Sequence, residues 1–187
     1  MEKRTKIFDC IICNKFSIEI ICKECQKKLL TPTPKIKDDI LYFYEYDEIE
    51  YLLKYKYHKF GHSIFHILAK NSLKIFANNI KEKFFLIPIE NRIKNFSHTA
   101  ILAKEMKTKY LTPLYSSLIA TNDVKYAGKT LEFRLNNPRN FIYKGPKNID
   151  AILIDDIATT HLTINEAKEK LKENKVNVYL SLVLAHS

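Results

Sequence analysis

Residues 152–163 of the chain are Ile-Leu-Ile-Asp-Asp-Ile-Ala-Thr-Thr-His-Leu-Thr, and this stretch carries the strongest signal for the fold. Its apolar start predicts a buried strand that holds Asp155 and Asp156 at its carboxyl end. The hydroxyl-rich turn that follows predicts a change of direction into a helix beginning near Thr163. Backbone N–H groups at a helix start attract anions, because the positive end of the helix dipole lies there. We therefore expect a strand, an anion-binding turn and a helix in this order.

The acids and the threonines of this stretch have different chemical preferences. Two adjacent carboxylates repel a phosphate, and they suit the hydroxyl pair of a ribose or a divalent cation beside it. Threonine hydroxyls and free N–H groups suit a phosphate, so the combination describes phosphoribosyl pyrophosphate (PRPP). The residues expected to contact it are Asp155, Asp156, Ala158, Thr159, Thr160, His161 and Thr163. The alternative is an ordinary strand-to-helix turn in which Asp and Thr act as caps.

All four cysteines lie near the N-terminus in two C-x-x-C pairs, Cys10 with Cys13 and Cys22 with Cys25. Each pair can point two thiolates at one centre, and two pairs complete a tetrahedral zinc site with no open position. Such a closed Zn²⁺ site is structural. Two disulfides or a redox-active pair are the other interpretations, and the doubled motif favours zinc. We expect a zinc module with its linker over residues 1–34, because the Thr-Pro repeat at 31–34 is typical of a linker.

The remainder of the chain, residues 35–187, alternates strand and helix patterns. Expected strands cover residues 40–46, 84–88, 151–155 and 176–184, with short ones near 114 and 118. Expected helices cover residues 48–59, 63–80, 99–109, 130–136 and 163–173, with a break at Gly61. This alternation predicts an α/β fold with a mostly parallel sheet flanked by helices. Ligands bind such sheets at the carboxyl ends of the strands, where the two acids are expected.

The composition limits the partners of the chain. The 187 residues carry a formal net charge of +10, which favours a polyanionic partner because a field of that sign attracts phosphates at long range. No apolar run is long enough to cross a bilayer. The first six residues are mostly charged and do not resemble a signal peptide, so we expect a cytoplasmic protein.

A basic and aromatic stretch at residues 51–60 suits single-stranded DNA, since lysines neutralise phosphates and aromatic rings stack on bases. The predicted DNA-binding residues are Lys54, Tyr55, Lys56, Tyr57 and Lys59. The alternative is an amphipathic helix with lysines in solvent. A second group of cations includes Arg134 and Arg139, and Arg92 and Arg134 are also suited to pair with pyrophosphate, since a planar guanidinium fork fits phosphate oxygens.

The stretch at 152–163 resembles the PRPP loop of type I phosphoribosyltransferases. That loop has four apolar residues, Asp-Asp, two variable residues, Thr-Thr-Gly and a further Thr. The chain departs from it at His161, where the family has a glycine that lets the backbone approach the 5′-phosphate. A histidine at this place can still donate a hydrogen bond to a phosphate. The resemblance implies a type I phosphoribosyltransferase-like fold and Mg²⁺ bound together with PRPP.

Together with the cysteine motif, the loop is similar to the ComF family, competence-associated proteins of phosphoribosyltransferase fold. Further similar segments are Leu53-Lys54-Tyr55-Lys56-Tyr57, Ile87-Pro88-Ile89-Glu90-Asn91-Arg92, the degraded Lys94-Asn95-Phe96-Ser97, and the triplet Arg134, Asn137 and Phe141. Tyr126 stands where the family usually has glutamine. The resemblance implies a cytoplasmic protein of natural transformation that binds incoming single-stranded DNA and PRPP, with other DNA-uptake or recombination proteins as partners. The alternative is an active phosphoribosyltransferase with an unidentified nucleobase-like acceptor, so enzymatic activity stays open.

Overall fold

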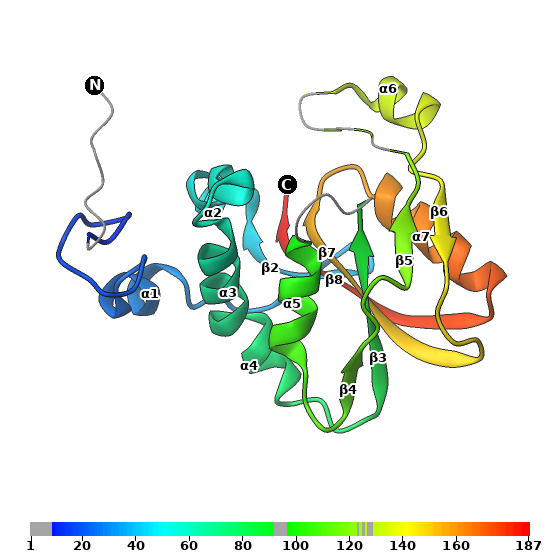
Figure 1. Cartoon of the computed structure of the whole chain (residues 1–187), viewed down its shortest axis with the longest axis horizontal. Coiled ribbons are helices and arrows are strands. Elements are labelled where there is room, and N and C mark those ends of the chain that lie inside the picture. Colours follow the sequence, from blue (N-terminus) through cyan, green and yellow to red (C-terminus); the bar gives the residue numbers. More distant parts are fainter. Residues whose placement is uncertain (1–8, 92–96, 123, 125, 127–128) are drawn as a thin grey trace.

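A computed structural model describes residues 9–91, 97–122, 124, 126 and 129–187 (Figure 1). The helices are α1 (Lys23–Leu29), α2 (Tyr46–Leu53), the 3-10 helix η1 (Lys54–Tyr57), α3 (Gly61–Asn71), α4 (Leu73–Ala77), α5 (His98–Met106), α6 (Leu131–Asn136) and α7 (Leu162–Glu173). The strands are β1 (Lys35–Lys37), β2 (Ile40–Glu45), β3 (Phe84–Glu90), β4 (Leu111–Pro113), β5 (Leu118–Ala120), β6 (Phe141–Tyr143), β7 (Ile149–Ala158) and β8 (Val176–His186). None of these helices is both long enough and apolar enough to span a membrane.

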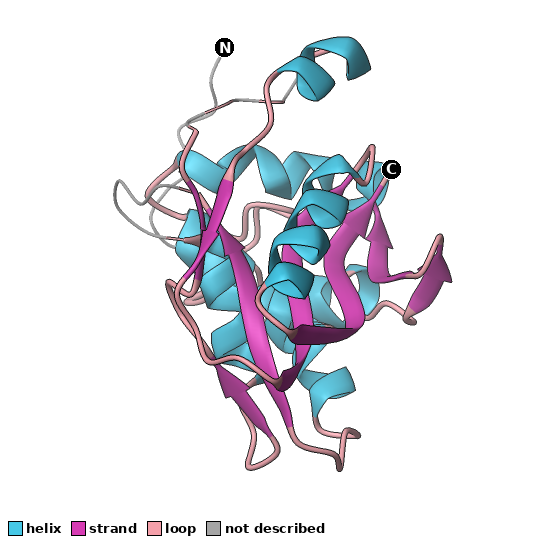
Figure 2. Ribbon diagram, turned by 90° about the vertical axis from the view of Figure 1, so that its right-hand side faces the viewer, coloured by secondary structure: helices cyan, strands magenta, loops and turns pink. Residues whose placement is uncertain are grey.

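The strands form one sheet in the order β1-β2-β8-β7-β3-β5-β6, and β4 also pairs with β3. The central pairs are parallel, whereas β1 with β2 and β5 with β6 are antiparallel at the two edges. Helices lie on both faces of this sheet, with α2 to α5 on one side and α7 on the other (Figures 1 and 2). The expected α/β class with a mostly parallel sheet is therefore confirmed.

Alternating side chains of the strands build two cores, one on each face of the sheet. On β2, Leu41 and Phe43 belong to the core under α2 to α5, whereas Ile40 and Tyr42 belong to the core under α7. This period of two is what a strand buried on both faces requires. Both faces of the sheet are thus packed against helices.

The N-terminal segment packs on the same core as the main domain. Ile21 and Leu30 are completely buried in the cluster that includes α2 to α5. The Tyr44 hydroxyl donates a hydrogen bond to the carbonyl oxygen of Leu30 at 3.1 Å. Figure 1 shows this segment beside α2 and α3, away from the sheet. The boundary after residue 34 stays a prediction.

The two expected helices at 48–59 and 63–80 are each divided in the structure. The first gives α2 and η1, and the second gives α3 and α4, which meet at Ser72. Gly61 is the first residue of α3, and a side chain does not fit there because a Cβ would lie only 2.6 Å from the carbonyl oxygen of Tyr55. The Ser72 hydroxyl donates to the carbonyl oxygen of Leu68 at 2.6 Å, which favours the bend at that place.

The strand that carries the two acids is longer than expected. β7 does not end at Asp155: it continues to Ala158, because Asp155, Ile157 and Ala158 all pair with residues of β8. The sequence predicts the acids at the carboxyl end of the strand, and the structure places them three and two residues before that end. Only Thr159, Thr160 and His161 remain to connect β7 to α7.

Candidate functional site

The connection between β7 and α7 is short and consists of Thr159, Thr160 and His161. His161 is the N-cap of α7 and has a left-handed backbone with φ of 55°. A side chain in this region costs about 1 kcal/mol relative to glycine, which explains why glycine is favoured at this position in the loops that it resembles. The carbonyl oxygen of His161 accepts the first helical hydrogen bond, from the N–H of Asn165 at 2.9 Å. The exposed Thr159 and Thr160 directly precede this start of the helix.

Arg134 of α6 supplies a cation to this loop. Its Nη1 donates to Oγ1 of Thr159 at 2.6 Å and to Oγ1 of Thr160 at 3.2 Å. The sequence suggested a pyrophosphate role for Arg134, and the structure brings its guanidinium to the threonines predicted to hold the phosphate. Arg92, the other arginine of that suggestion, lies outside the described residues.

A tyrosine and a second arginine accompany Arg134. The guanidinium carbons of Arg139 and Arg134 lie 4.6 and 5.7 Å from the ring centroid of Tyr126. The Nε atoms of both arginines are buried and have no hydrogen-bond partner within the described part of the chain. A buried donor without a partner is costly, so each of these two Nε groups can still take a hydrogen-bond acceptor. The sequence analysis named Arg134 and Arg139 as cations, and its only signal for Tyr126 was the replacement of the usual glutamine.

Glu166 of α7 holds the backbone at Arg139 and Asn140, and sequence analysis did not identify it. Its carboxylate accepts hydrogen bonds from the backbone N–H groups of Arg139 and Asn140 at 3.0 and 2.6 Å. A surface hollow of about 280 Å³ lies on this side of α7 and is lined by Glu166, Glu169 and Glu173 among others. These carboxylates repel phosphate, so the hollow is a poor place for the expected ligand.

The two acids lie behind the loop and are nearly buried, with 9% of Asp155 and 7% of Asp156 exposed. The backbone N–H of Asp156 donates to Oδ1 of Asp155 at 2.8 Å. Burial, together with the charge of Asp156, raises the pKa of Asp155 to about 7. Burial would also raise the pKa of Asp156, but the charge of Lys56 outweighs it and lowers that pKa. The pair therefore carries one negative charge and one proton below neutral pH.

Lys56 of η1 reaches this buried site. Its ammonium forms an ion pair with the Asp156 carboxylate, and its carbonyl oxygen contacts Nε2 of His98 at the start of α5. Burial and then the charge of Lys56 lower the pKa of His98, which favours its neutral form. Sequence reasoning placed Lys56 in a DNA-binding stretch and had no signal for a partner so distant in the chain.

The other members of that stretch do not belong to this buried ion pair. Lys54, Tyr57 and Lys59 are exposed, and 83% of the Tyr57 side chain is accessible. Lys59 lies over the ring of Phe60, with its Nζ 4.9 Å from the centroid. Tyr55 is half-buried and packs against the core. The assignment of these residues to DNA binding stays a prediction.

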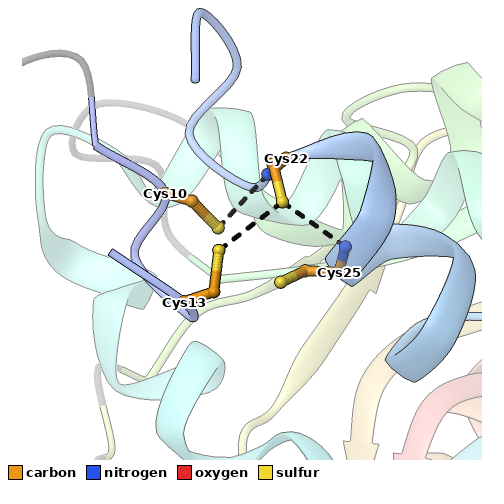
Figure 3. Close-up of side chains that lie close together, drawn as sticks. All are labelled: Cys10, Cys13, Cys22 and Cys25. Carbon is orange, nitrogen blue, oxygen red and sulfur yellow. Dashed lines mark hydrogen bonds between the residues drawn. The ribbon is translucent and has the colours of Figure 1, made fainter. Parts of the chain in front are cut away.

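The four cysteines converge on one point, as Figure 3 shows. Their sulfur atoms all lie within 4.8 Å of one another, no disulfide joins them, and those of Cys13 and Cys22 are 3.7 Å apart. A tetrahedral zinc with Zn–S bonds of about 2.3 Å requires sulfur atoms about 3.8 Å apart, so the cluster fits this ion. Burial opposes ionisation of Cys10, but backbone N–H groups outweigh it and lower its pKa to about 6. The predicted convergence of the four cysteines into a cluster suited to a metal ion is thus confirmed, and the binding of Zn²⁺ there stays a prediction.

The sequence matches no protein-family model, and no curated protein matches it. The chain is similar in structure to UMP synthase of Leishmania donovani, with a TM-score of 0.42 and 16% identity over 72% of this chain and 24% of that one. It is also similar to a hypoxanthine phosphoribosyltransferase of Staphylococcus aureus, with a TM-score of 0.39 and 16% identity over 65% and 61% of the two chains. An adenine phosphoribosyltransferase of Saccharomyces cerevisiae gives a TM-score of 0.43 and 13% identity over 89% and 90%.

The chain thus spans about a quarter of the UMP synthase and less than two thirds of the hypoxanthine enzyme. At such identities and scores the likeness concerns the course of the chain alone, and the roles of residues rest on the geometry of the site itself. The mixed sheet and its flanking helices agree with the α/β class that the sequence predicts, and the narrower type I phosphoribosyltransferase-like fold stays a prediction.

Proposed function

We propose that the chain binds PRPP together with Mg²⁺ at the loop between β7 and α7. The observation that carries the proposal is the contact of Arg134 with the hydroxyls of Thr159 and Thr160, directly before the N-terminus of α7. This arrangement offers a guanidinium fork, two hydroxyls and free backbone N–H groups to one anion. Two carboxyl groups lie behind it for the hydroxyls of a sugar.

Each part of PRPP has a partner in this proposal. Thr159, Thr160 and Thr163, with the backbone from Ala158 to His161, hold the 5′-phosphate. Asp155 and Asp156 accept hydrogen bonds from the ribose hydroxyls, and Lys56 then shares Asp156 with the ligand. Mg²⁺ binds chiefly to oxygens of the pyrophosphate, as is usual for this ion with phosphate ligands.

Calorimetry with PRPP and Mg²⁺ tests the proposal. Arg134→Gln should weaken binding about 10- to 100-fold, because a charged hydrogen bond contributes about 1.5 to 3 kcal/mol. Thr160→Val should weaken it about 2- to 10-fold. Thr112→Val changes an equally exposed threonine on β4 and should have no effect. If the intact protein does not bind at millimolar PRPP, the site is wrongly assigned.

A second function, binding of single-stranded DNA, is favoured by the exposed Tyr57 between the cations of η1 and the following turn. With the resemblance to the ComF family, this supports a cytoplasmic role in natural transformation. Incoming single-stranded DNA and DNA-uptake or recombination proteins would be the partners. In the same proposal residues 1–34 form a structural Zn²⁺ module and residues 35–187 the phosphoribosyltransferase-like domain.

The alternative is turnover of PRPP by transfer of its ribosyl phosphate to a nucleobase-like acceptor. The observation that favours it is the pKa of Asp155 of about 7, which suits a group that exchanges a proton at neutral pH. An assay of pyrophosphate release from PRPP with each common nucleobase separates the two. Release that depends on one base supports a transferase, and binding without release supports a ligand site.

A further inference from the structure

A second group of potential metal ligands lies at the loop of residues 159–161, between β7 and α7. It consists of Asp38 in the turn between β1 and β2, His161 at the N-cap of α7 and His186 at the end of β8. One ligand atom of each residue lies within 4.8 Å of those of the other two. The two Nε2 atoms of the histidines face each other at 2.9 Å.

The backbone fixes two of these three residues. His186 pairs with Ala158 of β7 and Glu45 of β2, so it is held in the middle of the sheet and is only 1% exposed. Asp38 has a left-handed backbone with φ of 48° in a tight turn. The three ligands thus come from separate parts of the chain, and only the fold brings them together. They are not neighbours on one helix.

The donor set points to a particular class of ion. Imidazole nitrogens suit Zn²⁺ and its neighbours in the first transition row, whereas Mg²⁺ and Ca²⁺ prefer oxygen ligands only. Two histidines and one carboxylate are a known set for zinc, and they leave a fourth position for water or a ligand. The four-cysteine site has no such open position.

The distances fit this class of ion after a small adjustment. Two nitrogens bound to a tetrahedral zinc at about 2.1 Å are about 3.4 Å apart, so the histidine rings would separate by about 0.5 Å. His161 and Asp38 are more exposed than His186 and have room for this movement. The Nδ1 atom of His186 is buried without a partner in the described part of the chain, so Nε2 is the nitrogen available to the site.

We propose that Asp38, His161 and His186 bind one divalent cation of the Zn²⁺ class, separate from the ion of the four cysteines. The ion joins the N-cap of α7 to the end of β8 and to the turn between β1 and β2. By binding His161, the ion stabilises the left-handed backbone of this residue in the loop between β7 and α7. A glycine adopts the same backbone conformation without such help. The proposal concerns metal binding and does not depend on PRPP binding by the loop.

Titration of the full chain with Zn²⁺, followed by NMR of the histidine ring nitrogens, tests this site. The experiment starts from protein whose metal content has been measured by elemental analysis. The Nε2 signals of His161 and His186 should shift together and saturate at one equivalent beyond the zinc that the four cysteines hold. If either signal stays in place while zinc binds elsewhere, the proposed site is wrong.

Two variants identify the ligands without disturbing the buried His186. Asp38→Asn should weaken binding at this site at least about tenfold, and His161→Gln should abolish the zinc-dependent shift of the His186 ring signal. Asp39→Asn removes the same charge from the neighbouring exposed residue and should change nothing. Equal effects of Asp38→Asn and Asp39→Asn would overturn the proposal, because they would show attraction by charge and not ligation.

Discussion

The ammonium group of Lys56 forms an ion pair with the carboxylate of Asp156, although the two residues are 100 positions apart. The side chains are only 20% and 10% exposed, so the pair lies largely out of water. Burial acts to lower the pKa of Lys56, but the Asp156 charge outweighs it and raises that pKa. The contact thus joins η1 to β7 and determines which of the two acids keeps the proton.

Loss of Lys56 should be costly because it leaves a buried charge without its partner. We expect Lys56→Met to lower the free energy of unfolding by about 3 kcal/mol at pH 8, measured by urea denaturation. Lys54→Met removes an exposed lysine that pairs with Glu50 four residues away, and should cost less than about 0.5 kcal/mol. The double variant Lys56→Met with Asp156→Asn should recover part of the loss. Equal costs for the two lysines would contradict a buried pair.

Lys56 also shows what a local pattern does not reveal. The lysines and tyrosines at 51–60 predict a surface for DNA, but their spacing carries no information about Asp156, the partner of Lys56 on a distant strand. A Cβ at Gly61 would collide with the carbonyl oxygens of Tyr55 and Lys56, so the turn after η1 requires a glycine there. His186 likewise stands in no motif, and only the sheet brings it to His161.

Other features were predictable because their signals are local. The spacing of Cys10, Cys13, Cys22 and Cys25 predicts convergence, since each pair forms one turn of fixed shape. The order of apolar residues, acids and threonines predicts a strand, a loop and a helix, and all three are present. The end of β7 was misplaced because strand length depends on β8, which pairs as far as Ala158.

Asp155 should make stability depend on pH. Its pKa rises from 3.8 to about 7 on folding, so the folded state binds more protons than the unfolded state between these values. The free energy of unfolding should therefore fall as pH rises from about 4.5 to 7, and remain level above that. Asp155→Asn should remove this slope and be more stable than the natural chain at pH 8, by roughly 1 to 4 kcal/mol. Parallel pH profiles for the two proteins would refute the raised pKa.

The cysteine cluster should hold one zinc per chain, measured by elemental analysis of reduced protein. Cys10→Ser should remove the ion and lower the thermal midpoint of the whole chain by several degrees, because Cys10 and Cys25 share the core with α2 and α3. Lys23→Gln changes an exposed residue between the ligands and should keep both zinc and stability. Zinc-free natural protein, purified under reducing conditions without chelator, would reject the assignment.

Binding of single-stranded DNA should depend on Lys54 and Lys59, and not simply on the net charge. Replacing both by Gln should weaken binding and reduce the salt slope, d log K/d log[salt], by about 1.4 in magnitude, because each phosphate contact releases counterions from the strand. Tyr57→Ala should cost about 1 to 3 kcal/mol through lost base stacking.

The matched control is Lys81→Gln with Lys83→Gln, which removes the same charge from two exposed lysines before β3. These changes should leave the slope almost unaltered in fluorescence anisotropy with an unstructured oligonucleotide. Lys56 is kept in both variants, because its loss would disturb the acids and confuse DNA binding with stability. Equal losses for the two pairs of lysines would mean that the positive field of the chain, and not the surface around Tyr57, attracts the strand.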